Sequence, residues 1–145
     1  MHFGRRLGPV LRLEVDTTSL TPGPPGHVTL GLRLFVLNHG QRVGRFVEVI
    51  VWLPGPPLLG DLNVGSGHAR RIDELHDSKP TLQFIENQNV FHPRMRRRIL
   101  ELAVTLNTDL ILTHLDQPII QWAIYADEMA LQTDQRTLRD VGLAT

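Results

Sequence analysis

The 145-residue chain contains no cysteine. This absence excludes disulfide bonds, thiolate nucleophiles and metal sites with cysteine ligands. It also fits a reducing compartment, so the sequence predicts a cytoplasmic protein. No apolar run approaches the roughly 20 residues that a membrane-spanning helix needs, and no apolar segment follows the arginines near the N-terminus as it would in a secretory signal. We therefore expect no association with a membrane.

The chain also lacks net charge. Fifteen acidic side chains balance fifteen basic ones, and Lys79 is the single lysine. A chain with no excess of positive charge is poorly suited to non-specific nucleic-acid binding, which depends on neutralising phosphates. Hydrophobic residues make up 41% of the sequence and charged residues 21%, as in ordinary globular proteins. At this length we expect one domain over 1–145, with an ordered core at 8–140.

The most regular feature of the sequence is a pair of alternating apolar patterns within 26–54. Apolar residues recur at every second position in both halves, which predicts two half-buried strands. The residues between them, NHGQ at 38–41, tolerate positive φ, so the chain reverses there. Two arrangements remain open. The strands form a hairpin, with Arg33 opposite Phe46 and near Glu48, or they cross from one sheet to another.

The rest of the chain contains weaker strand patterns. A first strand is predicted at 9–15, followed by a connection at 16–26 that is rich in proline and glycine. Residues 54–80 show no periodicity, which predicts a long irregular connection with at most one helical turn at 69–75. Further strand patterns cover 81–91, 95–107, 119–125 and 129–138.

These patterns predict an all-β fold, an antiparallel β-sandwich of immunoglobulin-like layout with seven or eight short strands. The segment 95–107 also fits helical spacing, but its β-rich neighbours favour a strand. The apolar positions that alternate along these strands are expected to form the core. They are Leu30, Leu32, Leu34, Val36, Val47, Val49, Val51, Leu102, Val104, Trp122 and Ile124.

Two stretches resemble known families. The apolar strand, Asn38-x-Gly40 and the second apolar strand ending at Pro54 resemble immunoglobulin-like accessory β-sandwiches of bacterial proteins. The run WAIYADEM at 122–129 is similar to the final hairpin of the C-terminal β-sandwich in bacterial Schlafen-like, AlbA-type proteins, which are expected to bind nucleic acid or ATP. The resemblance implies an accessory module whose catalytic or binding domain lies elsewhere, and it implies no catalytic residue. Both cysteines of an antibody-type intersheet bridge are absent.

The second of the two long strands is apolar on both faces. Phe46, Ile50 and Trp52 lie opposite the valine positions, interrupted by Glu48. A strand of this kind is usually covered on both sides. The cover is another part of the chain, a partner protein or a second copy, so these three apolar residues are candidates for an interaction surface.

A basic cluster follows a few residues later. Its members are Arg94, Arg96, Arg97 and Arg98. Such a run can neutralise phosphates, and nucleic acid or an acidic protein surface is the functional interpretation. The alternative is a solvated entrance to a strand, or a sheet edge that charge protects from aggregation. The alternative is favoured because no aromatic residues alternate with the arginines and because Glu86 and Glu101 dilute the positive charge.

The stretch 68–77 is dense in residues that could bind a metal or transfer protons. His68, Asp73 and His76 are the metal-ligand candidates. The two histidines lie eight positions apart without an H-x-x-x-H pattern, so the sequence favours a solvated loop of alternating charges. The alternative hypothesis is a metal- or ligand-binding enzyme centred on this loop.

No serine lies in a G-x-S-x-G motif, so the sequence offers no catalytic residue of the hydrolase type. We also expect no cofactor. The sequence therefore favours a non-enzymatic interaction module that binds a protein partner or self-associates, through an exposed sheet edge or through the Phe46, Ile50 and Trp52 face.

Overall fold

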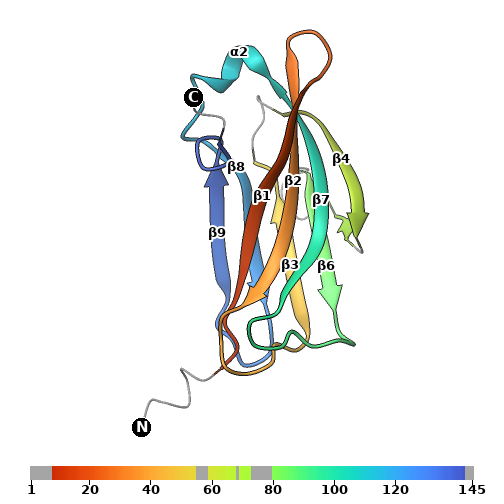
Figure 1. Cartoon of the computed structure of the whole chain (residues 1–145), viewed down its shortest axis with the longest axis vertical. Coiled ribbons are helices and arrows are strands. Elements are labelled where there is room, and N and C mark those ends of the chain that lie inside the picture. Colours follow the sequence, from red (N-terminus) through yellow and green to blue (C-terminus); the bar gives the residue numbers. More distant parts are fainter. Residues whose placement is uncertain (1–7, 55–58, 68, 73–79, 143–145) are drawn as a thin grey trace.

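The computed structural model describes residues 8–54, 59–67, 69–72 and 80–142, with the backbone alone at 59–67. Within these residues the chain forms two antiparallel sheets, and the prediction of an all-β sandwich is confirmed (Figure 1). The four-stranded sheet contains, in spatial order, β1 (Leu11–Pro22), β2 (His27–Asn38), β7 (Arg96–Asn107) and β4 (Leu59–Gly67). The five-stranded sheet contains β5 (Arg70–Arg71), β6 (Thr81–Glu86), β3 (Val47–Trp52), β8 (Pro118–Tyr125) and β9 (Gln132–Thr137). The short helix α2 (Thr108–Ile111) follows β7.

The core lies between the two sheets. Every residue that the sequence predicts for it is buried. β2 and β7 are neighbours in the four-stranded sheet, and their alternating apolar positions lie side by side in register. Leu32 pairs with Leu102, and Leu30 pairs with Val104. Because side chains on a strand alternate between its two faces, one apolar residue at every second position is enough to build this layer.

The reversal at 38–41 carries the chain from one sheet to the other. β2 belongs to the four-stranded sheet and β3 to the five-stranded sheet, so the hairpin alternative is wrong. Arg33 lies beside β7 instead, and its Nε donates to Glu101 Oε1 at 2.7 Å.

The side chain of Asn38 holds this crossing together. It is fully buried. Its Nδ2 donates to the carbonyls of Arg42 at 2.8 Å and Phe91 at 2.9 Å, and its Oδ1 accepts from the amides of Gly40 at 2.8 Å and Val10 at 3.3 Å. One amide group therefore satisfies four backbone groups that come from three separate parts of the chain.

The place of Gly40 in the turn led us to expect a positive φ. Its φ is not positive, and the residue is needed because there is no space for a side chain. A Cβ at this position would lie 2.4 Å from the carbonyl oxygen of Gly8 and 2.6 Å from the amide of Val10. The turn packs directly against the backbone that leads into β1.

We expect Gly40→Ala to lower the free energy of unfolding by about 2 kcal/mol, because the methyl group forces two backbone segments apart. Gly26→Ala is the comparison, since Gly26 has a φ of +80° with open space around it, and strain alone costs about 1 kcal/mol. Urea denaturation of both variants gives the measurement. A Gly40 variant as stable as the Gly26 variant would contradict the close packing.

Two irregular segments of the prediction are strands. β1 continues to Pro22, so the expected connection at 16–26 shrinks to a tight turn before β2. Within 54–80, β4 pairs with β7 and β5 pairs with β6, so the irregular connection is wrong for those residues. The helical turn at 69–75 is wrong at β5, and 73–75 lie outside the described residues. β4 and β5 are edge strands held by backbone pairing to one neighbour, which needs no alternating pattern in the sequence.

Candidate functional site

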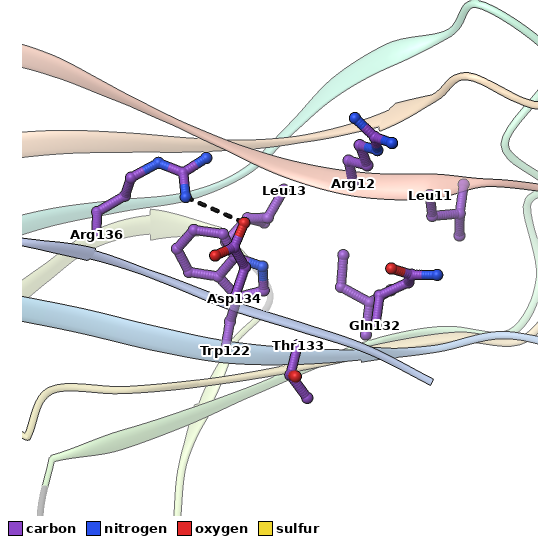
Figure 2. A pocket seen from close by; sticks show the side chains of 9 residues that line it. Leu11, Arg12, Leu13, Trp122, Gln132, Thr133, Asp134 and Arg136 are labelled. Carbon is purple, nitrogen blue, oxygen red and sulfur yellow. Dashed lines mark ion pairs between the residues drawn. The ribbon is translucent and has the colours of Figure 1, made fainter. Parts of the chain in front are cut away.

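A groove opens along one side of the sandwich, between the edge strands of the two sheets. β1 is an edge of the four-stranded sheet and β9 an edge of the five-stranded sheet. Figure 1 shows the two strands side by side. The groove between them has a volume of about 350 Å³, and Figure 2 shows it from close by. Its apolar lining is Leu11, Leu13, Trp122 and Ile124, and its polar lining is Arg12, Gln132, Thr133, Asp134 and Arg136.

β9 is polar on both faces. The register with β8 places Gln132 beside Ile124 and Asp134 beside Trp122, so these polar side chains share the face on which the core residues lie. An edge strand that carried apolar residues on this face would close over the core. With polar residues there, the space between β9 and β1 remains open as the groove.

The outer edge of β9 is closed by its own side chains. Asp134 Oδ1 accepts from the amide of Gln135 at 2.8 Å, and Arg136 Nη1 donates to the carbonyl of Gln135 at 2.7 Å. Asp140 Oδ2 accepts from the amide of Thr137 at 2.9 Å. Charged side chains that form hydrogen bonds with the free backbone groups of an edge strand keep other strands from pairing with it. This edge is therefore a poor template for a further strand.

Among the described residues, the outer edge of β1 is open at Leu13 and Val15. This stretch lies between a contact at Leu11 and one at Thr17, whose Oγ1 donates to the carbonyl of Val141 at 2.8 Å. The carbonyl of Val10 accepts a hydrogen bond from the first residue after β2, so Val10 faces its neighbour strand. The next amide, that of Leu11, points the other way and donates to Met129 Sδ at 3.3 Å. Alternation then turns the backbone groups of Leu13 and Val15 towards the groove as well. In the described structure β1 pairs with β2 alone.

Arg136 covers the aromatic floor of the groove. Its guanidinium carbon lies 5.0 Å from the ring centroid of Trp122, and Nη1 lies 3.2 Å from Asp134 Oδ2 (Figure 2). Together with the hydrogen bond to the carbonyl of Gln135, these contacts fix the orientation of the guanidinium. The groove thus has a cation at a defined position beside an apolar floor.

The predicted basic cluster is divided between different surroundings. Arg96 lies over the ring of Phe35, and it pairs with Glu14 at 2.6 Å and with Asp16 at 2.8 Å. The hydrogen bond that Arg96 donates to Glu14 is the main cause that raises the pKa of Arg96, and the bond that it donates to Asp16 adds to it. Arg98 pairs with a glutamate of its own strand at 3.1 Å. Arginines that are already paired with carboxylates attract phosphates less strongly.

The other two arginines of the cluster have structural positions. Arg97 lies near the rings of Phe84 and Phe91 and pairs across the sandwich with Glu86, Nη1 to Oε1 at 2.5 Å. Arg94 has a φ of 67° in the turn before β7. The four arginines therefore do not meet as one surface among the described residues.

The predicted apolar face of the second long strand is only partly present. Phe46 precedes β3, has a φ of 52° and is 58% exposed. This backbone conformation is not extended, so Phe46 stands outside the regular alternation that Ile50 and Trp52 follow in β3. The latter two are half-buried on the outer face of the five-stranded sheet. Trp52 Nε1 donates to Gln121 Oε1 at 2.7 Å.

The metal-ligand candidates His68, Asp73 and His76 lie outside the described residues. In the part of the chain that the structure describes, no group of three histidine, aspartate or glutamate side chains is placed to hold a metal ion. No helix of that part is long and apolar enough to cross a membrane.

The sequence did not point to the groove. Trp122 and Ile124 were expected in the core, and they are buried there while also lining the groove floor. The available signal was the segment QTDQRT at 132–137, which is polar at every position of a predicted strand. A strand that is polar on both faces indicates an edge with water on each side.

Known proteins resemble this chain only weakly, and only in structure. No family model matches the chain, and no curated protein matches it. Two solved structures are similar over 86% of this chain, which spans 17% of each of them. One is a GH20 exo-β-N-acetylglucosaminidase from Vibrio harveyi in complex with N-acetylglucosamine, at 13% identity and a TM-score of 0.40. The other is an inactive mutant of that enzyme, at 12% identity and a TM-score of 0.39.

Proposed function

We propose that this chain is a non-enzymatic interaction module that binds an extended segment of a partner protein as an additional strand on β1. The observation that carries the proposal is the open backbone edge at Leu13 and Val15, directly beside an apolar groove floor. Strand addition draws affinity from backbone hydrogen bonds and specificity from alternate side chains in a groove. Both requirements are met on the same side of the sandwich.

The asymmetry between the two edges supports β1 as the acceptor. The side chains of Asp134, Arg136 and Asp140 already occupy backbone groups of β9, and a new strand would have to displace them. On β1, the amide of Leu11 is bonded to the sulfur of Met129, which is a weak acceptor. A segment that pairs with β1 therefore loses few existing hydrogen bonds.

An immunoglobulin-like layout and an accessory role beside a larger bacterial protein belong to the same proposal. The crossing between the sheets from β2 to β3 and the neighbours β1, β2 and β7 support that layout. β4 occupies the edge beside β7 but precedes β6 in the chain, which differs from the usual strand succession. An accessory module needs a recognition surface and no reaction centre, which agrees with the groove.

The test combines selection of ligands with mapping of their position. A library of extended segments of about ten residues, the upper length of ordinary strands, is displayed and panned against the full chain. We expect the enriched segments to alternate between apolar and polar residues and to protect the amides of Leu13 and Val15 from hydrogen exchange. Failure to enrich any segment, or protection confined to other strands, would contradict the proposal.

Val15→Pro is expected to abolish this binding, with affinity falling more than about tenfold as hydrogen bonds of the added strand are lost. Proline is tolerated where an edge amide has no ladder partner, so the fold is retained, which circular dichroism verifies. Thr133→Pro is the matched control on the closed edge of β9, and it should leave β1 pairing intact. Equal binding by the Val15 variant and the unmodified chain would rule out strand addition at β1.

A further inference from the structure

Arg136 has hydrogen-bonding capacity that the described chain does not use. The guanidinium carries five N–H donors. Both recorded polar contacts, to Asp134 and to the carbonyl of Gln135, are made by Nη1. Nε and Nη2 have no acceptor among the described residues. These two nitrogens form a planar fork that matches the two oxygens of a carboxylate.

The surroundings hold that fork in place. The ring of Trp122 supports one face of the guanidinium, and the Nη1 contacts fix its rotation. The side chain of Arg136 is 34% exposed, so the fork is partly shielded from water without being sealed off. A guanidinium that is already oriented loses less conformational entropy when it binds a ligand.

Among the residues that the structure describes, the carboxylates near Arg136 leave its fork unoccupied. Asp134 contacts Nη1 at 3.2 Å, and Asp140 also lies close enough to interact with the charge of Arg136. Arg12 lines the β1 side of the groove, but its side chain is exposed between two buried leucines of β1 and so points to the outer face of the sheet. The side chain of Asp134 is 61% exposed, so its attraction for Arg136 is screened by water.

We propose that the segment that adds to β1 carries an acidic side chain directed into the groove, and that its carboxylate binds the Nε and Nη2 fork of Arg136. This inference rests on the proposed function and names the chemistry of the partner. The apolar neighbours of the acidic residue lie on Trp122 and Ile124, which line the floor of the groove. The partner is thus an extended segment with an acidic residue among alternating apolar ones.

The experiment compares two sets of synthetic peptides that alternate valine and threonine. One set carries a single Glu at each successive position, and the other carries Gln at the same positions. Titrations use the Trp52→Phe variant, so that the fluorescence of Trp122, beneath the guanidinium, reports binding. We expect the best Glu peptide to bind about tenfold more tightly than its Gln counterpart, as is typical when a hydrogen bond gains a charged partner.

Variants of the arginine separate the fork from the charge. Arg136→Gln should remove the preference for Glu, and Arg136→Lys should retain only part of it because an ammonium group has no planar fork. Arg33→Gln is the control, since Arg33 lies on the outer face of β2 and pairs with Glu101. That control should bind both peptides as the unmodified chain does.

The outcomes distinguish this inference from the proposed function. Equal binding of Glu and Gln peptides, with the amides of Leu13 and Val15 still protected, overturns the acidic requirement and leaves strand addition standing. No binding by either set, together with unprotected amides, overturns both. If glutarate alone perturbs Trp122 fluorescence as strongly as the best peptide, the site takes small carboxylates, and an acidic strand as its ligand is refuted.

Discussion

Replacing Asn38 by aspartate is expected to lower the free energy of unfolding by about 3–5 kcal/mol, the largest loss that we foresee for a single change. The carboxylate can still accept from the amides of Gly40 and Val10. It cannot donate to the carbonyls of Arg42 and Phe91, which lie 2.8 and 2.9 Å from Nδ2. Each buried carbonyl that loses its donor costs about 1–3 kcal/mol, and an unpaired buried charge adds to that cost.

The matched control is Asn107→Asp. Asn107 caps α2 by accepting from the amide of Asp109 at 3.0 Å, and a carboxylate serves that role as well as an amide does. We expect a change below about 0.5 kcal/mol there. Urea denaturation at pH 7 measures both variants. If Asn38→Asp proved as stable as the control, the four-way hydrogen bonding at the crossing could not be important for stability.

The second large effect concerns Glu86 and its response to acid. Its carboxylate accepts a hydrogen bond from Arg97 and further ones from the amides of Asn89 and Gln88. The bond from Arg97 is the main cause that lowers the pKa of Glu86 from 4.5 to about 2, with burial opposing it. The side chain is only 12% exposed, so water screens the pair weakly.

A pKa that is lower in the folded state means that folding favours the ionised carboxylate. The corresponding stability, about 3 kcal/mol, is complete above the ordinary pKa of 4.5 and is lost as the pH falls from about 5 towards 2. We expect Glu86→Gln to lose most of this stability at pH 7 and to show a much flatter stability profile in that acidic range. Denaturant titrations at pH 7, 4 and 2.5 give the profile.

Glu101→Gln is the comparison for this prediction. Glu101 also pairs with arginines, but its side chain is 31% exposed and that of Arg33 is 49% exposed. Pairs exposed to this degree contribute about 0–1 kcal/mol. Unchanged acid sensitivity in the Glu86 variant, or an equally large effect at Glu101, would show that the pair with Arg97 does not govern acid stability.

Most of the fold could be predicted from the alternating apolar patterns. The valines of β3 and the leucines of β2 and β7 are buried as expected, because period-two alternation directly encodes which face of a strand meets the core. The same reasoning favoured a strand over a helix at 95–107, and β7 confirms it. β4 and β5 were missed because an edge strand can be held by the backbone of its neighbour without any apolar pattern.

The residues of the candidate site could not be predicted from the alternating patterns. The four clustered arginines look alike in sequence, yet a register shift between Leu34 and Phe35 opposite β7 helps set which of them face the core side and which the outer face. Arg97 lies among aromatic rings and Arg96 lies over Phe35. Which carboxylate pairs with which arginine depends on long-range register.

By itself, the sequence determined that this protein is a two-layer β structure with a predictable core, since local alternation is a property of neighbouring residues. Only the tertiary structure decided that the chain crosses between sheets at Asn38 and that β1 and β9 end as facing edges with a groove between them. It also decided that one edge is closed by its own side chains while the other is open. These features depend on which distant strands lie side by side, and that choice is made by packing the whole core at once.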